Sequence, residues 1–260
     1  MTRRQLFTAT LVATAALVAT ATLVAAGLTP LSASAQASPA PGSATPSPRT
    51  VVLQPPPSPR TVVIQPPPSP RSLVIQPLGR TLSKPDVAEV VAALKTFYGL
   101  EVSVLPRRKL PRAAYYRPRR RYRAEKLLDH LGRIGPKNAY RILGLTAVDI
   151  STTKGQYRDW GIMGLANLSG RLCVISRFRC ARASRNRIHA RHRLAKVAVH
   201  EIGHTLGLDH CPNRGCLLES GKGSNKTTDR EYVLCARCRR KLRQLGFRLP
   251  PNPRPPWPKP

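Results

Sequence analysis

The chain has 260 residues, enough for one or two domains, but its first third is too rich in Pro, Ser and Ala to form a core, so one folded domain is expected. Its 44 Lys and Arg residues outnumber 12 Asp and Glu residues and give a formal net charge of +32 at pH 7. This charge attracts polyanions, but the absence of a helix-turn-helix, RNP motif or basic zipper pattern argues against sequence-specific nucleic-acid recognition.

Residues 1–35 have the pattern of a secretory signal peptide. Arg3 and Arg4 precede an uncharged run of mainly Ala, Val, Leu and Thr, and residues 33–35 (Ala-Ser-Ala) offer a small-residue cleavage site. We therefore expect an extracytoplasmic protein, periplasmic or secreted. The arginine pair fits twin-arginine export of a folded protein, and the Sec route remains equally open. Residues 6–29 are long enough to span a membrane, but their Thr and Ala content favours a cleaved signal over an anchor.

Residues 36–71 are expected to be a Pro/Ser-rich linker. An eleven-residue unit starts at Ser47, again at Ser58 and again at Ser69. Proline at the end of each unit removes backbone donors and favours extended polyproline II, so the repeats cannot pair into a sheet along their length. The apolar part of the third copy, residues 73–75, continues into the first predicted strand.

Residues 72–248 alternate strand-like and helix-like patterns. This alternation predicts an α/β (α+β) fold, in which a mixed twisted sheet is backed by helices. Residues 249–260 form a Pro-rich tail that is expected to end past the core. The predicted strands cover residues 73–78, 102–105, 142–150, 161–166 and 172–175, and the predicted helices cover 85–98, 122–131, 186–206 and 229–245.

The segment 200–211, HEIGHTLGLDHC, carries the strongest chemical signal. His200 and His204 are four residues apart and share one face of a helix, with Glu201 beside them. Gly207 permits a backbone reversal after which His210 can approach as a third ligand. Three protein ligands leave one position open, which is typical of a catalytic zinc, and Glu201 would be the general base. Two unrelated surface histidines would explain the first pair alone but not the glycine and third histidine in register.

Four cysteines have the spacing of a structural zinc site. Cys211 and Cys216 form one close pair, and Cys235 and Cys238 form a second pair after a loop. The chain is therefore expected to bind two Zn²⁺ ions, one catalytic and one structural. Folding and metal binding before twin-arginine export would protect these thiols from oxidation.

Two further cysteines remain outside that set. Cys173 and Cys180 are close enough in sequence to pair as a disulfide in an oxidising compartment. His130, His189 and His192 show no partner pattern and are expected at the surface.

The HExxHxxGxxHC segment, a cysteine four residues later and the distal CxxC together resemble the archaemetzincins, a family of metzincin zinc metallopeptidases. The resemblance covers about residues 72–248 and implies a metzincin-like catalytic domain with an HExxH active-site helix. It also implies that a peptide or protein substrate pairs with the strand at residues 161–166. The family's Met-turn methionine is replaced by Leu218, which has a similar volume.

Two functions follow from these patterns. The first is an exported zinc metallopeptidase that is expected to be monomeric. The alternative is a non-catalytic, zinc-stabilised protein that binds polyanions, supported by the charge and by Leu218. Non-specific contact with polyanions or a membrane surface is compatible with either function, and arginine used only at solvated positions would explain the charge equally well.

Overall fold

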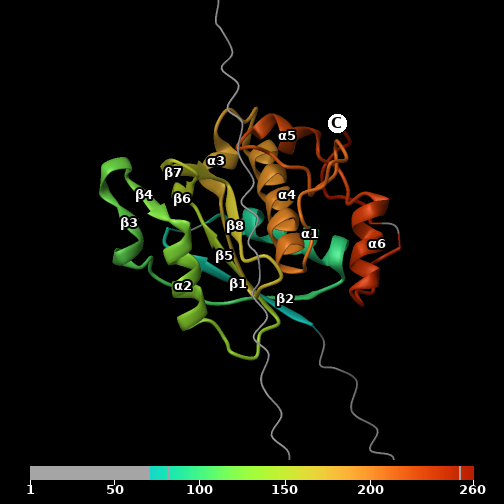
Figure 1. Ribbon diagram of the computed structural model, residues 1–260, viewed down its shortest axis with the longest axis horizontal. Coiled ribbons are helices and arrows are strands. Elements are labelled where there is room, and N and C mark those ends of the chain that lie inside the picture. Colours follow the sequence, from blue (N-terminus) through green and yellow to red (C-terminus); the bar gives the residue numbers. More distant parts are fainter. Residues whose placement is uncertain (1–70, 81, 252) are drawn as a thin grey trace, which may run out of the picture. The chain divides into compact units, whose positions relative to one another are not determined.

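The computed structural model describes residues 71–80, 82–251 and 253–260 (Figure 1). The predicted signal peptide and all but the last residue of the predicted linker lie outside these residues. No helix in the described part of the chain is both long and apolar enough to cross a membrane.

The larger of two sheets has five strands in the order β2-β1-β5-β9-β8 (Figure 1). Four of these strands run parallel, and β8 is an antiparallel edge strand. The predicted mixed sheet is thus confirmed. The strands are β1 (Ser72–Leu78), β2 (Glu101–Val104), β5 (Arg141–Thr146), β8 (Gly164–Ala166) and β9 (Leu172–Ser176).

A smaller sheet has four strands in the order β3-β4-β6-β7. Short 3₁₀ turns at Arg112–Ala114 and Arg117–Arg119 flank β3. Its strands are β3 (Tyr115–Tyr116), β4 (Arg121–Arg123), β6 (Ile150–Lys154) and β7 (Tyr157–Ile162).

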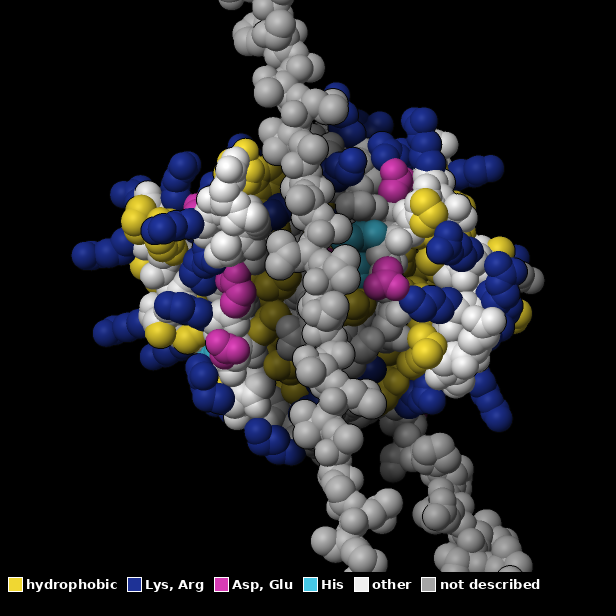
Figure 2. All heavy atoms as spheres, viewed as in Figure 1, with side chains coloured by type: hydrophobic (Ala, Val, Ile, Leu, Met, Phe, Trp, Pro, Cys, Tyr) yellow, Lys and Arg dark blue, Asp and Glu magenta, His cyan; other side chains and the backbone are white. Residues whose placement is uncertain are grey.

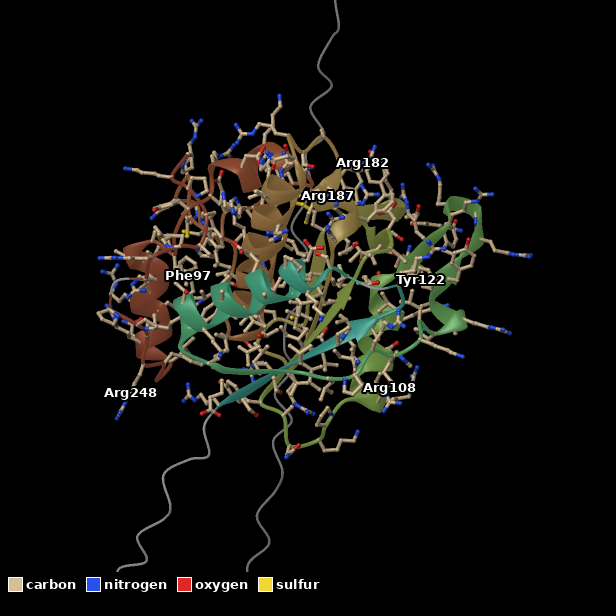
Figure 3. All side chains as sticks on the ribbon, turned by 180° about the vertical axis from the view of Figure 1, so that it is seen from behind. Phe97, Arg108, Tyr122, Arg182, Arg187 and Arg248 are labelled. Carbon is tan, nitrogen blue, oxygen red and sulfur yellow. The ribbon has the colours of Figure 1, made fainter. Side chains whose placement is uncertain are left out.

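Helices cover both faces of the five-stranded sheet. Successive side chains of β1 point to opposite faces, so Leu73 and Ile75 pack with α1 (Lys84–Tyr98) and α4 (Arg187–Thr205). Val74 and Leu78 pack instead with α2 (Ala124–Ile134). Viewed from behind, α1 crosses the sheet and carries the labelled Phe97 (Figure 3). The helices α3 (Arg177–Ala181), α5 (Asn225–Arg230) and α6 (Ala236–Gln244) complete the domain.

Helix α4 carries the histidine motif and is held at both ends and in its middle. The side chain of Asn186 caps its first turn by accepting a hydrogen bond from His189 N at 2.8 Å. Gly207 follows its end with φ +91°, a left-handed conformation that glycine adopts without strain. The hydroxyl of Tyr98 donates a buried 2.6 Å hydrogen bond to Val199 O and joins α1 to α4. The predicted helix at 186–206 and the predicted reversal at Gly207 are confirmed.

Three predicted elements are divided in the structure. The strand predicted at 142–150 becomes β5 and β6, which belong to different sheets. In the turn between them, the carboxylate of Asp149 pairs with Arg121 at 2.8 Å and with Arg179 at 2.7 Å. The strand predicted at 161–166 becomes the end of β7 and the whole of β8.

The helix predicted at 229–245 is also divided. It becomes α5 and α6, separated by an extended segment in which Val233 O accepts a hydrogen bond from Leu217 N at 3.0 Å. Cys235 then occupies the position just before the first residue of α6 instead of lying inside a helix.

The Pro-rich tail was predicted to end past the core, but in the structure it packs against the core. Trp257 is only 3% exposed and stacks on Phe97 with ring centroids 5.5 Å apart. Its indole nitrogen donates a 3.1 Å hydrogen bond to Tyr232 O. Trp257 therefore anchors the Pro-rich segment to α1, and Arg239 of α6 also donates hydrogen bonds to Pro250 O and Pro251 O. Composition alone could not reveal these contacts.

Candidate metal centres and active-site cavity

The three histidines of the motif converge as the sequence predicts. Each of His200, His204 and His210 offers one ring nitrogen, and these nitrogens lie within 4.8 Å of one another. The Nδ1 atom of His200 is 2.8 Å from Leu217 O, and that of His204 is 2.6 Å from Leu208 O. Since a carbonyl can only accept, both Nδ1 atoms carry the proton, which leaves the Nε2 lone pairs free for a metal.

Burial keeps this cluster neutral. It lowers the pKa of His200 to about 3, with a further contribution from His204. Burial also lowers the pKa values of His204 and His210. Neutral imidazole is the form that binds a metal, so the donor set fits a Zn²⁺ ion with three protein ligands.

Glu201 lies beside this cluster and against the edge strand β8. It is 7% exposed, and burial raises its pKa to about 8. A Cβ atom added at Gly164 would come within 2.5 Å of Glu201 Oε1, so only glycine allows the strand to approach this closely. Within the described residues β8 pairs only with β9, which leaves its outer edge beside Glu201 without a strand partner.

A cavity of about 180 Å³ adjoins His200, Glu201 and His210. Its other walls include residues of β7, the turn at residues 220–223, and the side chains of Lys154, Met163, Val197, Thr228 and Glu231. Figure 2 shows histidine in a hollow of the surface, with Lys and Arg side chains gathered on both sides. Glu231, which is 3% exposed, was missed by the sequence analysis because no motif or spacing marks it.

Leu218 occupies the position at which the Met-turn methionine is expected from the resemblance to the family. It is completely buried and lies against Gly203 on the underside of α4. Its neighbour Leu217 accepts the hydrogen bond from His200. Leucine therefore fills the space beneath the histidines without contributing a ligand atom.

The four predicted zinc-binding cysteines also converge. The sulfur atoms of Cys211, Cys216, Cys235 and Cys238 lie within 4.8 Å of one another. The shortest separations are 3.6 Å for Cys211–Cys235 and 3.7 Å for Cys216–Cys238, far longer than the S–S bond of about 2 Å in a disulfide. The close contact with the Cys238 sulfur lowers the pKa of Cys216 to about 5. Four sulfurs at this spacing fit closed tetrahedral zinc coordination.

The expected disulfide between Cys173 and Cys180 is not formed. Both thiols are free and completely buried. Cys173 lies in β9 near Ile142 O, at 3.9 Å, whereas Cys180 lies in α3 and donates to Ser176 O at 3.4 Å. Burial raises the pKa of Cys173 well above its usual value and that of Cys180 to about 12, which keeps both thiols protonated.

Two of the histidines without a predicted partner form side-chain contacts. His189 Nε2 lies 2.7 Å from Asp229 Oδ1, and the same carboxylate accepts two 2.7 Å hydrogen bonds from Arg193. His192 lies 3.7 Å from Glu89. These contacts connect α4 to α5 and to α1 and lie outside both metal centres.

The structure combines a mixed sheet whose edge strand begins at Gly164, a helix with two histidines and a third histidine after the helix. This combination is typical of zinc metallopeptidases. The model of peptidase family M54 matches residues 82–244 of this chain. An archaemetzincin from Haloquadratum walsbyi is 33% identical over 161 residues, which cover 59% of this chain and 90% of that protein.

Two solved structures agree with these matches. The crystal structure of archaemetzincin from Methanopyrus kandleri has a TM-score of 0.59 and 29% identity, and the match covers 69% of this chain and 97% of that chain. The archaemetzincin from Archaeoglobus fulgidus has a TM-score of 0.55 and 33% identity, with 65% and 99% covered. The chain therefore belongs to peptidase family M54, the archaemetzincins, and is a zinc-dependent metallopeptidase.

Proposed function

We propose that this chain hydrolyses peptide bonds outside the cytoplasm, with His200, His204 and His210 holding a catalytic zinc and Glu201 acting as general base. The convergence of three neutral imidazoles beside a buried carboxyl group carries this proposal. The likeness to archaemetzincins supports it independently.

The histidines, Glu201 and the edge of β8 have different roles in the proposed reaction. A zinc ion at the three histidines would polarise a carbonyl and make water reactive near neutral pH. Glu201 in its ionised form, which the positive charge of a zinc ion beside it would favour, accepts the proton of the attacking water and later delivers it to the leaving amine. The free edge of β8 accepts the substrate backbone as an added strand, which places the scissile bond next to Glu201.

Cys211, Cys216, Cys235 and Cys238 would hold a second, structural zinc. This site connects the segment that follows the third histidine to the start of α6. It thereby holds the chain around His210, a residue that no helix or strand supports.

Zinc exchange tests the two sites together. A mild chelator should remove one zinc per chain and abolish hydrolysis of a peptide library, while a second zinc stays bound, because closed thiolate coordination leaves no solvent-facing position. Added zinc should restore activity. A purified chain with only one zinc and a Cys211–Cys216 disulfide would contradict the structural site.

Export is a separate part of the proposal and rests on residues 1–35. Conservative replacement of Arg3 and Arg4 by Lys should block translocation on the twin-arginine route, whereas a Sec signal tolerates it because it needs only positive charge. Normal export of the double variant would assign the chain to the Sec route, and retention of the parent in the cytoplasm would contradict export.

A second function, non-catalytic binding of polyanions, is favoured by the charge alone. Arginines lie at widely separated places, such as Arg182 and Arg187 at one end and Arg248 at another (Figure 3). Binding of this kind weakens steeply with added salt and does not depend on Glu201. A monomer that binds heparin or DNA but cleaves no peptide when loaded with zinc would support it.

A further inference from the structure

A second carboxyl group, that of Glu231, lines the active-site cavity together with Glu201. Glu231 directly follows α5 and is held by a 3.1 Å hydrogen bond from its own backbone nitrogen to Thr227 O. The proposed reaction gives Glu201 a role but uses no second acid. The presence of Glu231 at this cavity therefore needs its own explanation.

The carboxyl group of Glu231 lacks a close partner. Among the described residues it forms no hydrogen bond and no ion pair, although the residue is only 3% exposed. Burial raises its pKa well above the usual value, against an opposing effect of nearby Lys196. The carboxyl oxygens are not fully enclosed, so they reach the cavity, and a bound group that supplies hydrogen bonds and positive charge would be stabilised there.

Lys196 is the cation with the largest effect on Glu231, but its ammonium group is directed elsewhere. Its ammonium group donates to Thr228 O at 3.0 Å and to Asp229 O at 3.2 Å. Burial lowers its pKa to about 8, so part of its positive charge is already lost near neutral pH. Lys196 therefore affects Glu231 through its charge, without a hydrogen bond, and leaves the cavity side of the carboxyl group open.

The cavity has the size and lining for one long cationic side chain. Its volume of about 180 Å³ is below the range of small-molecule sites, roughly 300 to 1,000 Å³. Trp160, Met163 and Val197 provide apolar walls for a methylene stem, and buried Glu231 provides a carboxyl group for a charged head. The side chains of Lys and Arg match this lining, because each has an apolar stem that ends in a charged head.

We propose that this cavity is a specificity pocket for a Lys or Arg side chain next to the scissile bond of the substrate, with Glu231 as its counter-ion. The inference rests on the proposed peptidase function and names its substrate class. An acidic side chain is the alternative occupant, because exposed Lys154 and Lys222 also line the cavity. The ammonium group of Lys154, however, lies 5.0 Å from the centre of the Trp160 ring, and both lysines are exposed, so solvent screens their charge more than that of buried Glu231.

Matched peptides test the pocket in the parent protein. A library digest first identifies the cleaved bond, and three peptides are then compared that differ only in Lys, norleucine or Glu beside that bond. The zinc-loaded parent should cleave the Lys peptide with a kcat/KM about ten- to hundredfold higher than the norleucine peptide, as expected for a charge-assisted hydrogen bond. Equal rates, or a preference for the Glu peptide, would overturn the inference.

Two variants assign the preference to one residue. Glu231→Gln keeps the size of the side chain and should abolish the preference for Lys, measured as the ratio of kcat/KM for the Lys and norleucine peptides. Glu89→Gln removes the same charge from α1, away from the cavity, and should keep the preference. A Glu231→Gln variant that still prefers Lys would refute the assignment.

A binding measurement separates failure of the pocket from failure of the proposed reaction. The zinc-loaded Glu201→Gln variant should bind the Lys peptide at least about tenfold more tightly than the norleucine peptide, whether or not the parent cleaves either. Tight, selective binding without cleavage by the parent would contradict the peptidase function but support the pocket. Equal affinities would overturn the pocket even if the parent is an active peptidase.

Discussion

The side chain of Leu218 lies directly against Gly203 in the helix that carries the histidines. A Cβ atom added at Gly203 would be 3.1 Å from both Cδ atoms of Leu218 and 2.9 Å from the hydroxyl oxygen of Tyr98. Because Tyr98 is tied to Val199 O, it cannot move without losing a buried hydrogen bond. This contact fixes how closely α4 packs on the segment beneath it.

Replacing Gly203 by Ala should therefore destabilise the protein. Alanine is favoured over glycine inside a helix by about 1 kcal/mol, but overpacking against Leu218 and Tyr98 costs about 1–3 kcal/mol and should dominate. Affinity for the catalytic zinc should fall as well, since His200 and His204 flank Gly203. Chemical denaturation and zinc titration measure both effects.

Leu218→Met provides the matched control for this prediction. It conserves volume and should cost less than about 1.5 kcal/mol and leave zinc affinity unchanged. A Gly203→Ala variant as stable as the parent, or a Leu218→Met variant that loses zinc, would show that this contact does not set the position of the helix.

Trp257 should contribute strongly to the stability of the domain despite its place near the C-terminus. Trp257→Ala removes the stack on Phe97 and the hydrogen bond to Tyr232 O, and a buried tryptophan replaced by alanine costs about 3–5 kcal/mol. Thermal unfolding should show a clear decrease in Tm, whereas Lys259→Ala, an exposed change in the same tail, should have almost no effect. Equal Tm values for the two variants would mean that the tail does not stabilise the core.

The sequence predicted the metal centres better than their surroundings. His200, His204 and His210 could be placed together because helical spacing and a glycine-permitted reversal are local properties of the chain. The four cysteines could be grouped because a common zinc ligand set brings both pairs to one point.

Features that depend on distant contacts could not be predicted. The extended segment between α5 and α6 exists because Val233 pairs with Leu217, and a local pattern of helix-forming residues gives no sign of that contact. The burial of Trp257 depends on Phe97, and the place of Glu231 in the active-site cavity depends on the packing of α5 beside α4. The free thiols of Cys173 and Cys180 likewise follow from their separate elements and not from their spacing.

The carboxylate of Asp229 should make stability dependent on acid pH. Burial alone would raise its pKa, but hydrogen bonds from Arg193 and His189 hold the pKa below its usual value. Its contribution is therefore fully present above the ordinary Asp pKa of about 3.9 and is lost as pH falls through the lower folded-state value.

Asp229→Asn should cost about 1–2 kcal/mol at pH 6, because the carboxylate is partly exposed and its attraction to Arg193 is screened by solvent. The difference from the parent should shrink as the pH is lowered below 4. Asp129→Asn, a change on the exposed face of α2, serves as control and should show neither effect. A difference that stays constant down to pH 2 would contradict the role of this ion pair.

Zinc content and peptide hydrolysis, measured on the same preparations of the parent, Glu201→Ala and His204→Ala, test the central claim most directly. Glu201→Ala removes the base but no metal ligand, so it should keep the parent's zinc content while hydrolysis falls by about 10²- to 10⁴-fold. His204→Ala should lose the catalytic zinc together with activity. Unchanged hydrolysis by Glu201→Ala, or no hydrolysis of a broad peptide library by the zinc-loaded parent, would contradict the mechanism.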